Sequence, residues 1–194
     1  MKKTIFGIAI LAISLSACNS DNKTSEKEET KNDTTQNNSS ALADNKDESV
    51  NGSMHEMVTQ YLQIKNALAN DNGKDAATAG NAFVASMSKM EKTSMPPEKV
   101  KIWDNLSDDA KEMAEHIGEN ANKIDHQREH FDMLSNDMYD MVKAFGAGQT
   151  LYKDFCPMYN KNKGASWLSE TKEIKNPYMG KKMATCGEVK EELK

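Results

Sequence analysis

The sequence has few aromatic residues, no basic block and no apolar run long enough to cross a membrane. Phe, Trp and Tyr make up only 6% of the 194 residues, and the net charge is −5. A protein that binds nucleic acid by electrostatics needs a basic surface and often aromatic side chains that stack on bases, so the composition argues against this class. The only long apolar stretch, residues 5–15, is shorter than the roughly 20 residues that span a bilayer.

The sequence also lacks the short motifs of common enzyme classes. It has no Walker loop, no dinucleotide-binding glycine fingerprint, no serine elbow and no zinc-protease pair of histidines with glutamate. The glycines at 146 and 148 indicate only the end of a helix. We therefore expect a protein that is not an enzyme.

The first eighteen residues are similar to a bacterial lipoprotein signal. Two lysines precede the apolar run, and the run ends in small residues directly before Cys18. A basic, an apolar and a small-residue segment in this order are typical of export. The resemblance implies a signal peptide over residues 1–17, lipidation of Cys18 and a stable membrane anchor. We expect an exported protein, anchored by lipid to the cell envelope, with its domain in the periplasm or at the cell surface.

The composition of the segment after Cys18 predicts a flexible tether. Residues 19–53 contain no aromatic residue and are rich in Asn, Asp, Ser, Thr, Lys and Glu. Such a segment buries too little apolar surface to offset the entropy lost on ordering. We therefore predict a disordered tether over 18–53, followed by a single domain over 54–194.

Beyond residue 53, apolar residues recur every three or four positions, which is the period of an amphipathic helix. Four segments show this pattern, from the first at 54–68 to the clearest at 124–145. Short connections between such helices favour antiparallel neighbours. The sequence predicts an all-α fold, an antiparallel four-helix bundle with an irregular Gly- and Pro-rich C-terminal segment packed on it.

Local signals predict where these helices begin and end. Pro96 and Pro97 end the second helix, because proline lacks an N–H and disfavours helix at the preceding residue. Ser107 is suited to the N-cap of the third helix. Gly146 is suited to the left-handed position that follows the fourth.

Two pairs of sulfur residues lie in the C-terminal third. Cys156 and Met158 form the first pair, and Met183 and Cys186 form the second. The Gly- and Pro-containing chain between them is able to fold back and bring the pairs together. Thiolate and thioether sulfurs are soft ligands that select Cu(I) over hard cations. We therefore expect a Cu(I) site at these four residues.

Histidines add further candidate ligands. His126 and His130 are spaced i, i+4 and thus share one helix face, where either could complete a copper site or orient a ligand. Zinc bound by the two cysteines and these histidines is the alternative, although thioethers are not usual zinc ligands. His55 is a weaker candidate, and we interpret His116 as a solvated helix residue.

The same two cysteines also suit a structural disulfide. An exported protein leaves the reducing cytoplasm, and a Cys156–Cys186 bond would stabilise the C-terminal segment by about 3 kcal/mol. The sequence leaves the disulfide and the metal site open. The methionines on the predicted helices are interpreted as core residues, since methionine adapts to irregular gaps.

Several motifs together resemble a known but uncharacterised domain family. They are Tyr61 to Leu68, Gln127-Arg128, Phe131, Leu134-Ser135, Cys156-Pro157-Met158, Gly164 to Leu168, Asn176 to Gly180, Met183 and Cys186-Gly187. The family occurs as lipoproteins and as the C-terminal domain of periplasmic adaptor proteins of copper- and silver-type efflux pumps. The resemblance spans about residues 54–190.

This resemblance implies a helical domain associated with heavy-metal handling. It also implies a cation efflux system or a metal-transfer protein as the partner. The chain has no room for the hairpin and barrel modules of a pump adaptor, so the adaptor role itself is not implied.

Two functional hypotheses follow. In the first, the chain is a lipid-anchored envelope domain that binds Cu(I) in copper handling or efflux. In the second, it is a non-metal, disulfide-stapled interaction lipoprotein of the envelope. Sulfur atoms too far apart to share an ion would refute the predicted copper site, whereas a Cys156–Cys186 bond together with no metal uptake after reduction would favour the second hypothesis.

Overall fold

The computed structural model describes the backbone of residues 39–194 and the side chains of residues 48–194. The predicted leader, Cys18 and the first part of the predicted tether lie outside the described residues. The elements are α1 (Ser39–Ala69), α2 (Gly73–Met87), a 3-10 turn (Lys92–Ser94), α3 (Pro97–Glu119), α4 (Ile124–Phe145), β1 (Leu151–Cys156), α5 (Tyr159–Asn162), β2 (Ala165–Ser169), a second 3-10 turn (Gly180–Met183) and β3 (Glu188–Leu193).

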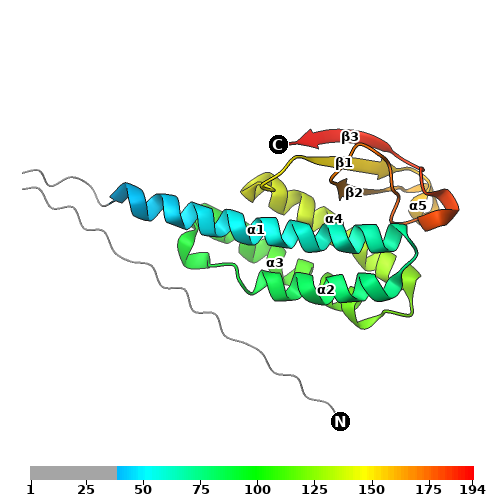
Figure 1. Ribbon diagram of the computed structural model, residues 1–194, viewed down its shortest axis with the longest axis horizontal. Coiled ribbons are helices and arrows are strands. Elements are labelled where there is room, and N and C mark those ends of the chain that lie inside the picture. Colours follow the sequence, from blue (N-terminus) through cyan, green and yellow to red (C-terminus); the bar gives the residue numbers. More distant parts are fainter. Residues whose placement is uncertain (1–38) are drawn as a thin grey trace, which may run out of the picture. The chain divides into compact units, whose positions relative to one another are not determined.

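The four long helices pack in chain order, α1 on α2, α2 on α3 and α3 on α4, and lie side by side (Figure 1). No helix within residues 39–194 has both the length and the apolar character needed to cross a membrane. The mostly helical character is confirmed. The helix methionines interpreted as core residues are buried in the core or pack against it; they are Met57, Met87, Met90, Met113, Met138 and Met141.

The first helix begins earlier than the sequence predicted. It starts at Ser39, so residues 39–53, which we assigned to the tether, belong to α1. Val50 is already buried against the core, and the Ser53 hydroxyl donates to the carbonyl of Lys89. Extending a helix that already exists avoids the cost of nucleation. The polar composition of this segment therefore does not prevent it from being helical.

The third helix also begins earlier. It starts at Pro97, and Ser107 is a buried residue inside the helix rather than its N-cap. Proline is favourable at the first helical position, because its fixed φ suits a helix and its missing N–H needs no partner. The two prolines therefore mark the start of α3, whereas α2 has already ended at Met87.

The C-terminal segment is not irregular, and the all-α prediction was wrong here. Its strands form an antiparallel sheet in the order β2-β1-β3, which lies along α4 and α1 (Figure 1). Strand β1 is central, and its Asp154 pairs with Trp167 of β2 and Val189 of β3. The strand was missed because the buried positions of β1 do not alternate regularly and one is a carboxylic acid.

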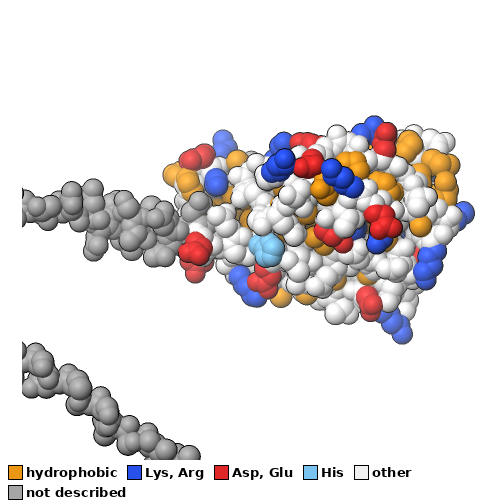
Figure 2. Space-filling view, turned by 45° about the horizontal axis from the view of Figure 1, so that its top comes forward, with side chains coloured by type: hydrophobic (Ala, Val, Ile, Leu, Met, Phe, Trp, Pro, Cys, Tyr) orange, Lys and Arg blue, Asp and Glu red, His pale blue; other side chains and the backbone are white. Residues whose placement is uncertain are grey.

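The edge strand β3 carries mainly charged residues. Its glutamates form ion pairs with lysines, including Lys143 with Glu191 at 3.0 Å and Lys172 with Glu192 at 3.4 Å. Figure 2, which turns the sheet side forward, shows acidic and basic side chains interleaved on this face. Charge on an edge strand discourages pairing with another chain. Because most residues of β3 are charged, the strand also lacks the apolar alternation by which a strand is predicted from sequence.

Arg128 of α4 fastens the C-terminal segment to the helices. Its guanidinium donates to the carbonyls of Leu68 and Pro177, at 3.1 and 2.9 Å, and to the Asp71 carboxylate at 2.6 Å. The hydrogen bond from Arg128 lowers the pKa of Asp71. Gly180 lies next to the Arg128–Asp71 ion pair and has a φ of +53°. A Cβ at this position would overlap the Asp71 carboxylate. Glycine is therefore required at this position.

Helices α2 and α3 approach closely at Gly80. A Cβ on Gly80 would lie 2.9 Å from the carbonyl oxygen of Ala114, which is a backbone atom and cannot rotate away. The small residues of α2 thus allow close packing. This contact sets the position of α3, which carries one residue of the site described below.

Asp154 is a fully buried carboxyl whose two oxygens have no hydrogen-bond partner. Burial raises its pKa to about 7, although the charge of Lys65 opposes the shift. Lys65 is itself 1% exposed and pairs with Glu170 at 2.7 Å. Below about pH 7, the protonated, neutral form of Asp154 is therefore favoured in the folded protein.

We predict that Gly80→Ala destabilises the protein, although alanine usually favours a helix by about 1 kcal/mol. The added methyl collides with the Ala114 carbonyl, so we expect the free energy of unfolding to fall by about 1–3 kcal/mol. Denaturant unfolding measures the change. Gly52→Ala in α1 is the matched control, because nothing lies within 4 Å of its added Cβ. Equal effects of the two substitutions would contradict the packing argument.

We predict that Asp154→Asn reduces the loss of stability between about pH 4 and pH 7. In the unfolded chain the carboxyl ionises near its ordinary pKa of 3.8, whereas in the folded protein it stays protonated up to about 7. Rising pH therefore favours the unfolded chain, by up to about 4 kcal/mol from this group. Other carboxyls with raised pKa values, such as Asp137, remain in both proteins. Identical pH profiles of stability for the two proteins would refute the assignment.

Candidate metal centre

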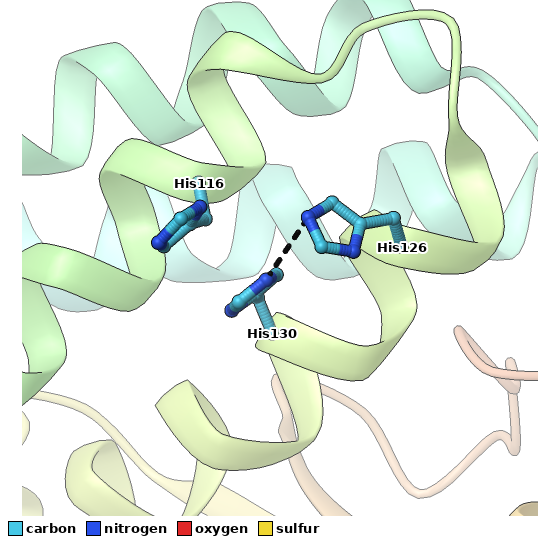
Figure 3. Close-up of side chains that lie close together, drawn as sticks. All are labelled: His116, His126 and His130. Carbon is cyan, nitrogen blue, oxygen red and sulfur yellow. Dashed lines mark hydrogen bonds between the residues drawn. The ribbon is translucent and has the colours of Figure 1, made fainter.

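Three histidines from two helices form one cluster. His116 is in the last turn of α3, and His126 and His130 are in the first turns of α4. One nitrogen of each ring lies within 4.8 Å of the others. Figure 3 shows the three rings close together, with a dashed line that joins His126 and His130. Three imidazoles this close together could hold one metal ion.

The rings have fixed relative orientations. His116 and His130 are stacked, with ring centroids 4.3 Å apart and planes 8° from parallel, while His126 is nearly perpendicular to His130. The Nε2 atoms of His126 and His130 are 3.2 Å apart. A metal about 2.0–2.1 Å from both nitrogens would see them at an angle of about 100°, close to tetrahedral. The spacing of this pair therefore already suits a shared ion.

The side chain of Gln127 holds the end of α3 to the start of α4 by hydrogen bonds to backbone carbonyls. Its amide nitrogen donates to the carbonyls of Ile117 in α3 and Gly73 in α2, each at 2.9 Å. Gln127 is fully buried and lies next to His126 in the chain, as Ile117 does to His116. These hydrogen bonds lie directly beside His116 and His126 in the chain. They therefore fix the relative position of the two histidines, which favours a rigid site.

Each ring also has a neighbour at its other nitrogen. Nδ1 of His126 is 3.5 Å from the Glu129 carboxylate, and Nε2 of His116 is 3.8 Å from that of Glu112. Nδ1 of His130 is 3.3 Å from the sulfur of Met113. Partners that accept the outer N–H of a metal-binding histidine leave the inner nitrogen free to ligate. Of these three contacts, the one between His130 and Met113 is a hydrogen-bond contact, and the two carboxylates lie at ion-pair distance.

The electrostatic setting favours neutral imidazoles and attracts cations. Burial, and then the neighbouring His116 and His126, lower the pKa of His130, so its metal-binding neutral form is favoured. Helices α3 and α4 together carry twelve acidic and five basic side chains, which attract a positive ion. The side chains of His116 and His126 are 40% and 39% exposed. The ion would therefore be accessible to an exchanging partner.

The structure places the predicted sulfur residues differently. Cys156 and Cys186 form a disulfide, with their Cα atoms 5.7 Å apart. Disulfide sulfurs are not thiolates, so the predicted Cu(I) site of four sulfurs does not exist in this oxidised form. Met158 is 49% exposed before α5, and Met183 is partly exposed in the second 3-10 turn. Of the four predicted sulfur ligands, the structure brings Cys156 and Cys186 into direct contact.

The predicted histidines fare differently from one another. His126 and His130 lie together as predicted candidates, but the third member, His116, was interpreted from the sequence as a solvated helix residue. The signal was present: His116 and His126 lie at similar distances from the turn between α3 and α4, and an antiparallel hairpin brings such positions together. His55 lies outside this cluster and is within 3.4 Å of the carbonyl of Ala147.

We predict that removing the disulfide lowers stability without any involvement of the histidines. The bond closes a loop of 30 residues that ties β1 to the segment before β3. The double variant Cys156→Ala/Cys186→Ala should lose about 3 kcal/mol of unfolding free energy. Reductant should destabilise the unmodified protein by a similar amount and leave the variant unchanged. A reductant effect of equal size on both proteins would show that it acts elsewhere.

Comparison with known proteins adds one result. Residues 57–150 match a protein family of unknown function, DUF3347. No curated protein and no solved structure matches the chain. The matched range includes all three clustered histidines and ends before the disulfide and the sheet. The matched range thus spans the last thirteen residues of α1 and all of α2, α3 and α4.

Proposed function

We propose that this chain is a metal-binding domain of the cell envelope that holds a copper ion as cargo at His116, His126 and His130. One observation carries the proposal: three imidazoles from two helices have nitrogens within 4.8 Å of one another. The role is binding rather than catalysis.

Structural needs alone explain this cluster poorly. The three rings are partly exposed and contribute little to the buried core, which consists of apolar side chains. If more than one ring were protonated, like charges would repel across a few ångströms. A bound cation removes this cost, because it takes the lone pairs of neutral rings.

Copper is the first candidate and zinc the second. Imidazole nitrogen suits both ions. Structural zinc sites almost always have four protein ligands, whereas the cluster supplies three, so zinc would need a water molecule as its fourth ligand. The resemblance of the chain to a family associated with copper and silver efflux also supports Cu(I).

The location follows from the leader. The signal over residues 1–17 and lipidation of Cys18 would anchor the protein to the envelope, with the domain at the periplasm or the cell surface. A partly exposed site permits ligand exchange with a metal-transfer protein or a cation efflux system. We propose such a protein as the partner.

The second candidate function is a non-metal interaction lipoprotein of the envelope. The Cys156–Cys186 disulfide favours it, because the bond removes the two thiolates that a soft-metal site would use. On this alternative the histidine cluster binds no ion with useful affinity.

We predict one-to-one binding of Cu(I) that depends on the cluster. The purified chain is titrated with Cu(I) against a competing chelator, in ascorbate, which keeps copper monovalent and spares protein disulfides. Replacing His116, His126 or His130 by alanine should each weaken binding at least tenfold, because one of three ligands is lost. A parallel titration with Zn(II) tests the second metal.

Two controls separate the alternatives. His55→Ala removes a histidine outside the cluster and should leave the affinity unchanged. Cys156→Ser/Cys186→Ser should also leave it unchanged. Binding that is lost in the cysteine variant and retained in the histidine variants would return the site to the sulfur residues. Failure to compete for either metal would favour the interaction lipoprotein.

A further inference from the structure

Met113 of α3 differs from the core methionines in what its sulfur contacts. Met57 and Met138 are fully buried in the apolar core. Met113 is only partly buried, and its Sδ lies 3.3 Å from Nδ1 of His130. The contact crosses from α3 to α4 at the edge of the histidine cluster.

The chemistry of this contact restricts the position of one proton. A neutral imidazole carries one N–H, on either Nδ1 or Nε2. A thioether sulfur has lone pairs but no hydrogen, so it can only accept. The contact is therefore favourable only when Nδ1 of His130 carries the proton. In that tautomer the lone pair of His130 is on Nε2.

This lone pair is directed at the metal position. Nε2 of His130 is 3.2 Å from Nε2 of His126, whose own Nδ1 faces the Glu129 carboxylate. If Nδ1 carries the proton in both rings, the lone pairs of the two Nε2 atoms face each other and repel. A cation between the two Nε2 atoms would bind both lone pairs and so remove this repulsion. Met113 approaches the opposite nitrogen of the His130 ring, so it lies outside this first set of ligands.

We propose that Met113 is a positioning residue of the metal site, which holds His130 in the tautomer that presents Nε2 to the ion. The inference rests on the proposed function, because it concerns the same three-histidine site. It predicts that Met113 affects every metal bound there to a similar extent. A direct thioether ligand would instead favour Cu(I) over Zn(II).

The test compares Met113→Leu with Met133→Leu in the full chain. Leucine is close in volume to methionine and lacks the acceptor, so folding should be kept. Met133 is the matched control: it lies on α4, is 44% exposed and makes no hydrogen bond to the cluster. Nitrogen-15 NMR of the metal-free proteins reports the tautomer of His130, and competition titrations give the affinities for Cu(I) and Zn(II).

We expect His130 to carry its proton on Nδ1 in the unmodified protein and in Met133→Leu. In Met113→Leu this preference should be lost, and both metals should bind about 10–100-fold more weakly, the usual effect of losing such an outer partner. Met113→Gln, whose carbonyl oxygen can accept the same N–H, should restore part of the preference and part of the affinity.

Two results would overturn the inference. An unchanged tautomer combined with a selective loss of Cu(I) affinity would make Met113 a direct ligand. An unchanged tautomer with unchanged affinities would leave Met113 as a packing residue. Failure of the proposed function is a separate result: neither metal would bind the unmodified protein, while the NMR of metal-free His130 would still decide the role of Met113. If Met113→Leu does not fold, an Nε2–H tautomer in the unmodified protein would by itself refute the proposal.

Discussion

The guanidinium of Arg128 is the constraint on which the arrangement of this domain depends. It is nearly buried and joins the end of α1, the turn that follows it and the C-terminal segment to α4. A buried charge that loses its partners is costly, so these segments are held together. Residues two positions away on a helix point to the opposite side. Arg128 thus turns toward the C-terminal segment while His126 and His130, on either side of it, turn toward α3.

The domain uses its sulfur and nitrogen residues for different purposes. Cys156 and Cys186 form a covalent link beside the C-terminal sheet, which compensates for the few apolar residues of β3. The histidines lie on the helical hairpin instead, where Gln127 fixes the two helix ends. The three histidines thus lie inside the range that matches DUF3347, and both cysteines lie outside it.

Much of the helical part could be predicted because its signals are local. Apolar residues at three- and four-residue spacing mark the core faces of α1 to α4, and Gly146 does end α4 with a positive φ. The errors came from signals that compete. A polar segment joined the existing helix α1, and Pro97 began a helix where Ser107 was the expected cap. The strands lacked a clear alternation because Asp154 occupies a buried position and β3 is charged.

The sequence by itself determined the helical periods, the methionine-rich core and the presence of imidazole and sulfur ligands. It also determined that His126 and His130 share a helix face, because residues four apart always do. Only the tertiary structure decided which ligands meet. His116 joins them because of the angle and register at which α3 packs on α4. The cysteines bond because the sheet brings the end of β1 next to the segment before β3. Contacts between distant segments depend on the packing of the whole core, which no local pattern encodes.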